Sequence, residues 1–301
     1  MISKYTYKKL TWIDLESPTK EEVLALKDEY KLPPLVADEL YEPTTRSKVD
    51  KYSNVIYLIL HFPVIAGKGQ TEREIDFAIG KDFIITTHYE TIDPIHEFSK
   101  IFEVNSILDK SNMGDHAGFF FFYIMRELYH HTLIELDVLN RSLITVEKEI
   151  FEGDEGRTVE VISDINRKIV DCKQALRFHG EVLKSFENAG TEFFGKEFSY
   201  YLQSITGEYN KVQNMLDGHK EILKDLRETN DSLLANKTNE AMRTLTVMNF
   251  VMLPLALITG VFGMNANFVF IHNLRDFFVV VTAMVLVGTI MLFYFRKKRW
   301  I

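Results

Sequence analysis

The chain has 301 residues, of which 46% are hydrophobic and 26% charged, and its formal net charge at pH 7 is −8. Cys172 is the single cysteine, which excludes an intramolecular disulfide and a thiolate metal cluster within one chain. Residues 244–301 carry a net charge of +4, which leaves −12 for residues 1–243. Such an acidic region concentrates cations and argues against nucleic acid as a partner.

Residues 1–114 are predicted to form a domain of mixed helix and strand. No signal peptide is expected, because the N-terminal segment contains lysines but no uninterrupted apolar stretch. Strands are predicted at residues 5–15, 55–62, 75–79 and 83–88. A helix begins after the first strand, either at a capping box of Thr19 and Glu22 or at Ser17 with Pro18 following, and a second short helix covers 35–41. These elements predict an antiparallel sheet with helices packed on it.

Residues 115–196 are predicted to form a helical hairpin. Its first helix runs to about residue 152 and its second from about 158 to 187, and residues 119–122 are too short an apolar run to cross a membrane, so they belong to the core. A third helix begins near Phe198 and meets no stop before Gly263. That helix would have about 65 residues and a length of about 100 Å. Its part at 197–243 is predicted to be a stalk.

Residues 244–301 are predicted to cross a membrane twice. Neither 244–274 nor 277–295 contains Asp, Glu, Lys or Arg, and each run is long enough to span a bilayer as a helix. The basic run at 296–299 predicts a cytoplasmic C-terminus by the positive-inside rule. Two crossings then place residues 1–243 in the cytoplasm as well, which predicts a multi-pass protein of the cell membrane.

Polar and small side chains recur every three or four positions along the first span and so share one helical face. This face, called here the polar stripe, consists of Asn239, Met242, Thr246, Asn249, Leu253, Ala256 and Gly260. Two interpretations are open: a helix contact built on small residues, or the wall of a pore formed by several copies, since two helices cannot enclose a path alone. The pore is preferred, with Leu245 and Leu253 as apolar rings that close it by dewetting.

The C-terminal part of the chain carries a set of characteristic residues: 236–240, Met242, Leu245, Thr246, Pro254, Leu255, Gly260, 262–265 and 295–300. This set resembles the CorA family of magnesium channels. The resemblance extends in outline over the whole chain and implies a funnel-shaped homopentamer in the membrane lipid, with the first membrane helices lining the pore. It also implies that Gly263, Met264 and Asn265 form the outer selectivity filter.

A filter of amides and carbonyls suits Mg²⁺, which sheds its water reluctantly. A ring of Asn265 side chains with Gly263 carbonyls would hydrogen-bond to the hydrated ion, whereas a carboxylate ring would hold it too tightly. No phosphate-binding loop is found, and an interior-negative potential supplies about 4.6 kcal/mol per 100 mV for two charges. We therefore expect passive uptake of Mg²⁺, with Co²⁺ or Ni²⁺ as further ions. The alternatives are a Zn²⁺ transporter of the same family and a membrane-tethered scaffold; an enzyme is not expected.

The chain departs from the family pattern in three places. Phe262 replaces the usual Tyr before the tripeptide, and residues 266–274 contain no acidic residue, which weakens the expected capture of cations. The family's regulatory Mg²⁺ sites pair carboxylates across subunits, but 66–70 and 200–204 contain none. The possible substitutes are Glu72, Glu74, Glu208, Glu228 and Asp231. We expect Mg²⁺ gating to be retained with these shifted ligands.

Overall fold

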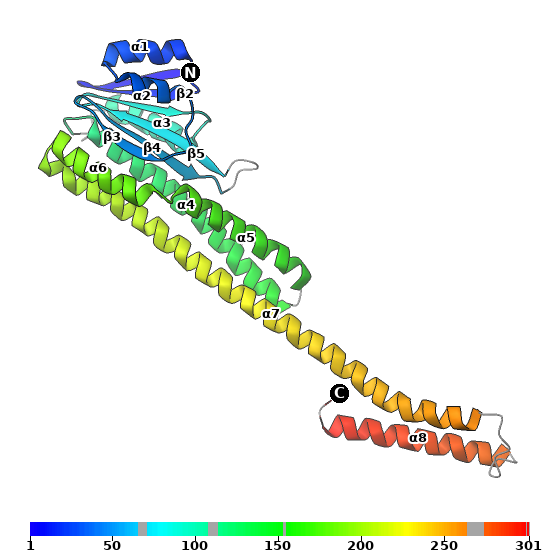
Figure 1. The fold of residues 1–301 in the computed structure, drawn as a ribbon. Coiled ribbons are helices and arrows are strands. Elements are labelled where there is room, and N and C mark those ends of the chain that lie inside the picture. Colours follow the sequence, from blue (N-terminus) through cyan, green and yellow to red (C-terminus); the bar gives the residue numbers. More distant parts are fainter. Residues whose placement is uncertain (66–70, 108–113, 153–154, 264–273, 299, 301) are drawn as a thin grey trace. The chain divides into compact units, whose positions relative to one another are not determined.

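The computed structural model describes the chain except for residues 66–70, 108–113, 153–154, 264–273, 299 and 301. The chain divides into two compact units, Met1–Arg227 and Glu228–Ile301 (Figure 1). The first unit contains a sheet with helices on both faces, and the second contains two apolar helices. The predicted boundaries at residues 114, 196 and 243 stay predictions.

The sheet of the first unit has the strand order β1-β2-β6-β5-β4-β3 in the described residues. The strands are β1 (Ile2–Tyr7), β2 (Leu10–Glu16), β3 (Lys48–Lys51), β4 (Ile56–Pro63), β5 (Glu72–Ile79) and β6 (Phe83–His88). The prediction of an antiparallel sheet was wrong at one pair, because β6 runs parallel to β2 with Thr11 opposite Phe83. The predicted strand at 5–15 is two strands, which turn at Lys8 with a φ of 53°.

Helices α1 (Lys20–Tyr30) and α2 (Pro34–Glu39) cover one face of the sheet (Figure 1). The capping box is confirmed: the Glu22 amide donates to Thr19 Oγ1 at 3.3 Å, and the Thr19 amide donates to Glu22 Oε2 at 2.8 Å. The core beneath these helices joins Val23 and Val36 to Ile59 of β4, all with 2% exposure or less. The amphipathic first helix is therefore fixed at its start by the cap and along its length by the core.

Aromatic side chains fill the opposite face, under α3 (Asp93–Ile107) and α4 (Gly118–Glu152). The Phe121 ring lies 5.1 Å from that of Phe77 in β5, and the Phe102 ring lies 5.1 Å from that of Phe120. The core position predicted for the run at 119–122 is confirmed for residues 120–122. Neither α3 nor β3 was predicted. Ile95, Phe98 and Phe102 of α3 do recur at helical spacing and are buried, whereas the four residues of β3 include one apolar side chain, Val49, and show no period.

The helix predicted at 158–187 is interrupted. The structure has α5 (Glu155–Ala175) and α6 (His179–Phe194), with a break at residues 176–178. Directly after the break, the His179 side chain is fully buried, with its Nδ1 2.8 Å from the Tyr129 hydroxyl and its Nε2 2.8 Å from the His61 carbonyl oxygen. The break lies within the predicted helix, and α6 continues past the predicted end at residue 187 to Phe194.

The long third helix is confirmed as one element, α7 (Ser199–Gly263), of 65 residues, which follows a 3₁₀ turn at Lys196–Phe198. Its C-terminal part lies in the second unit with α8 (Leu274–Lys297). By length and composition, both helices are apolar enough to cross a membrane, with mean hydropathies of 2.0 and 2.4 over the most apolar windows. Only 6% of each window is buried within the chain, so these apolar faces need another environment.

Candidate functional site

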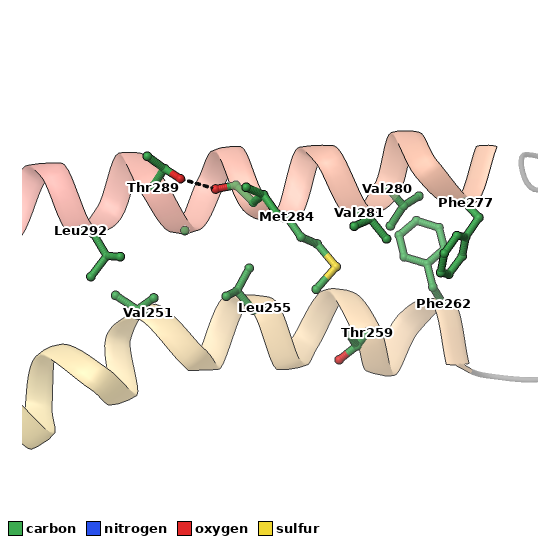
Figure 2. Close-up of a pocket in the computed structure, with 12 residues that line it drawn as sticks. Val251, Leu255, Thr259, Phe262, Phe277, Val280, Val281, Met284, Thr289 and Leu292 are labelled. Atoms are coloured by element: carbon green, nitrogen blue, oxygen red, sulfur yellow. Dashed lines mark hydrogen bonds between the residues drawn. The ribbon is translucent and has the colours of Figure 1, made fainter. Parts of the chain in front are cut away.

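The C-terminal part of α7 packs against α8 with one side only (Figure 2). On that side Val247 is 2% exposed, and the Leu255 side chain comes within 3.7 Å of the position that a Cβ would take at Gly288 of α8. Val251 and Ile258 on the same side are partly buried. The contact with α8 is therefore made by aliphatic side chains of α7 that recur every three or four positions, from Val247 to Ile258.

The polar stripe lies on the side of α7 that α8 leaves open. All seven of its residues are exposed in the chain, including Met242 at 60% and Leu253 at 70%. With 3.6 residues per turn, the middle of the stripe lies roughly 160° around the helix from the α8 contact. Leu245, which borders the stripe, is 56% exposed. The structure thus brings the predicted pore-lining residues onto one uncovered face.

The hydrogen bonding of this face suits a hydrated cation. The Thr246 hydroxyl donates to the Met242 carbonyl at 2.7 Å, so its proton is used within the helix and its oxygen remains as an acceptor. Asn249 presents an amide in the middle of a run without charges, and Asn239 presents another two turns or more before it. Lipid cannot satisfy an amide, so this face requires water or a polar partner.

The predicted regulatory carboxylates occupy different surroundings. Glu208, in the first unit, forms an ion pair with Lys211 at 2.8 Å. Glu228 and Asp231, in the second unit, are both exposed and lie three residues apart on one helical face. Within the described residues, no group of three or more His, Cys, Asp or Glu side chains is placed to hold a metal ion. The regulatory role of these carboxylates stays a prediction.

Glu74 is disfavoured as a regulatory ligand by its position. It is 9% exposed, and its carboxylate accepts hydrogen bonds from the Thr44 amide at 2.7 Å and the Thr44 hydroxyl at 3.3 Å. Its neighbour Asp76 is wholly buried and accepts a hydrogen bond from the Tyr57 hydroxyl at 3.0 Å. Burial and the negative charge of Glu74 hold the pKa of Asp76 well above its usual range. These side chains belong to the interior of the sheet domain.

Residues 7–297 match the family described as CorA-like Mg²⁺ transporter protein. The chain belongs to this family. The family is one of transporters and not of enzymes, in agreement with the expectation from the sequence. The resemblance noted at the C-terminal motif thus extends to nearly the whole chain, and transport of divalent cations is the activity class to which it belongs.

Two relatives and one solved structure are similar over almost the full length. The chain is 24% identical to the cobalt/magnesium transport protein CorA of Thermotoga maritima, covering 97% of this chain and 83% of that protein. It is 22% identical to the protein of the same name from Methanocaldococcus jannaschii, covering 97% and 92%. The structure of the CorA magnesium transporter from Methanocaldococcus jannaschii matches with a TM-score of 0.86 and 20% identity, covering 99% and 94%. This match shows that the fold is that of a CorA transporter.

The filter predicted for this CorA family member lies at the edge of the described residues. Gly263 is the last residue of α7, as expected for a residue that tolerates the end of a helix, while Met264 and Asn265 lie outside the described residues. Pro254 sits within α7 without ending it, and its missing N–H leaves the Phe250 carbonyl without its usual helical partner. The filter itself remains a prediction from the motif.

Proposed function

We propose that the chain is one subunit of a homopentameric channel for passive entry of Mg²⁺, with Co²⁺ and Ni²⁺ as further ions. The observation that carries the proposal is the polar stripe, whose residues are all exposed on the face of α7 that α8 leaves uncovered. Several copies arranged with this face toward a common axis would enclose an aqueous path. The two relatives named as cobalt/magnesium transport proteins support Mg²⁺ and Co²⁺ among these ions.

In the proposed channel, Asn249 and the Gly263–Asn265 tripeptide hydrogen-bond to the hydrated ion without removing its water. The acidic residues of 1–243 raise the local concentration of cations at the cytoplasmic side, where both termini lie. In the inner membrane of a cell, the interior-negative potential supplies about 4.6 kcal/mol per 100 mV for a divalent ion. Rings of Leu245 and Leu253 form the apolar constriction that closes the path.

Regulation is proposed to act through Mg²⁺ bound between subunits. Glu208, Glu228 and Asp231 are the carboxylates of α7 assigned to this task, with each site completed by a neighbouring copy. Because α7 is one continuous helix through both units, a change in subunit packing around the stalk would reach the polar stripe. Equal open probability with and without millimolar cytoplasmic Mg²⁺ would contradict this assignment.

The channel proposal is tested by ion flux into liposomes that contain the purified chain. With an imposed interior-negative potential, Mg²⁺ entry should fall at least tenfold in Asn249→Leu and be abolished in Asn265→Ala. The matched control is Thr259→Val, which lies outside the polar stripe and removes a hydroxyl that donates to the Ala256 carbonyl at 2.9 Å. Unchanged flux in both asparagine variants would support the tethered scaffold, and faster entry of Zn²⁺ than of Mg²⁺ or Co²⁺ would support the zinc transporter.

A further inference from the structure

Helices α7 and α8 leave an elongated apolar groove between them (Figure 2). It has a volume of about 760 Å³ and is partly open to the surroundings. Phe262 and Phe277 line one end, Val251 and Leu292 line the other, and the Met284 side chain extends from α8 toward α7 between them. The groove thus follows the helices along the membrane-spanning direction.

The walls of the groove offer no spare hydrogen-bond donor. The two hydroxyls that line it donate within their own helices, Thr259 to the Ala256 carbonyl at 2.9 Å and Thr289 to the Val285 carbonyl at 2.7 Å. The remaining lining side chains are aliphatic, aromatic or thioether groups, with Gly288 as the one position without a side chain. An occupant must therefore be apolar and extended along the groove, as an acyl chain is.

Cationic side chains gather at the Val251 and Leu292 end. Arg296 follows Leu292 by one helical turn, and Arg243 precedes Val251 by two turns, so both lie beyond the same end of the groove. The Arg243 guanidinium lies 5.8 Å from the centre of the Trp300 ring, and both arginines are exposed. Lys297 and Lys298 add two further exposed cations, and the acidic residue in the adjacent turn of α7 is Glu240. The excess of positive charge suits a phosphate group.

The groove and the polar stripe face different directions. On α7, the groove-lining positions lie roughly 150° around the helix from the middle of the stripe, at 3.6 residues per turn. If the stripe faces the axis of an assembly, an occupant of the groove therefore leaves the aqueous path free. The apolar lining, together with the cations beyond one end, favours a lipid over a second copy of the chain.

We propose that this groove binds an acyl chain of an anionic phospholipid, whose phosphate is held by Arg243 and Arg296. The inference rests on the proposed function to the extent that α7 and α8 lie in a membrane. Each basic side chain near a membrane surface strengthens the attraction of anionic lipid by about 1 kcal/mol, which corresponds to about fivefold in affinity. The apolar groove makes lipid binding at this site more favourable than lipid binding elsewhere on the surface of α7 and α8.

The test is native mass spectrometry of the purified full chain after exchange into mixed phosphatidylglycerol and phosphatidylcholine. The wild type should retain phosphatidylglycerol preferentially. Arg296→Gln should weaken this preference about fivefold, and its matched control is Arg275→Gln, an exposed cation at the other end of α8. Gly288→Leu should fill the groove and reduce the number of retained lipids, whereas Ala283→Leu on the exposed far side of α8 should not.

Three outcomes would overturn the proposal. The first is equal retention of the two lipids by the wild type, and the second is an equal effect of Arg296→Gln and Arg275→Gln. The third is a change of oligomeric state in Gly288→Leu with no change in lipid number, which would assign the groove to a second copy. Lipid retention is read independently of transport, so lost Mg²⁺ flux with normal lipid retention counts against the proposed function alone.

Discussion

Replacing His179 by Gln tests how much the buried hydrogen bonds of this side chain, at the break between α5 and α6, contribute to stability. The imidazole is fully buried and lies between the Tyr129 hydroxyl and the His61 carbonyl oxygen, each at 2.8 Å. The short contact to a carbonyl requires Nε2 to donate, so Nδ1 accepts from Tyr129 and the ring is neutral. Gln also carries a donor and an acceptor but does not titrate. We expect the variant to lose about 1–3 kcal/mol of unfolding free energy at pH 7.5, because its amide cannot reproduce both contacts.

The size of the effect should depend on pH. Burial lowers the pKa of His179 to about 3. In the unfolded chain, histidine has its ordinary pKa of about 6.5. Below that pH, His179 binds a proton in the unfolded state but stays neutral in the folded state. The contribution of His179 is therefore complete above about pH 6.5 and decreases as the pH falls toward 3. At pH 5 the loss is about 2 kcal/mol, so the penalty of the Gln variant should shrink by about that amount.

The measurement is urea unfolding of the full chain in detergent, followed by tryptophan fluorescence. Trp300→Phe in the background leaves Trp12, which is 0% exposed, as the single reporter of the sheet domain. The pKa values of His61 and His88 are raised by their carboxylate partners and by backbone carbonyls, against the effect of burial, so the difference between variant and parent is the quantity to compare. The control is His130→Gln at an exposed position. A penalty for the His179 variant that is the same at pH 7.5 and pH 5 would refute the reasoning.

Three further predictions follow from particular contacts. Tyr57→Phe should destabilise the first unit by about 1–3 kcal/mol in the same urea assay, because buried Asp76 loses its hydroxyl donor; an unchanged midpoint would contradict the role of that bond. Thr19→Ala should lower the free energy of unfolding by about 1 kcal/mol, because it removes the side-chain cap of α1. Thr19→Ser keeps the hydroxyl and should change that free energy little. Leu253→Ser should raise Mg²⁺ leak through the closed channel several-fold in the liposome assay by wetting the constriction, and equal leak would argue against an apolar gate there.

Local signals in the sequence were sufficient for the features that depend on neighbouring residues. The capping box at Thr19 and the two apolar helices follow from a cap pattern and from the absence of charges. The unbroken course of α7 follows from the lack of a stop signal before Gly263 other than Pro254, which a membrane helix tolerates. The insertion of β6 beside β2 does not follow, because strand pairing depends on contacts between residues more than 70 positions apart. The burial of Asp76 is equally invisible, because its alternation with Ile75 and Phe77 is that of a solvent-facing strand position.

The polar stripe shows where sequence and structure each contribute to the functional argument. Its residues share a face because they recur at the helical period, which the sequence alone reveals. The period does not say which face α8 covers, because α7 has aliphatic side chains all around in this region, such as Leu253 within the stripe and Leu257 beside it. The structure places α8 against Val247 and Leu255, which leaves Asn249 on the free side. An amide turned away from α8 has no partner within a single tethered chain, whereas it can face water in a pore formed by several copies. The position of α8 therefore supports the proposed role of these residues in transport.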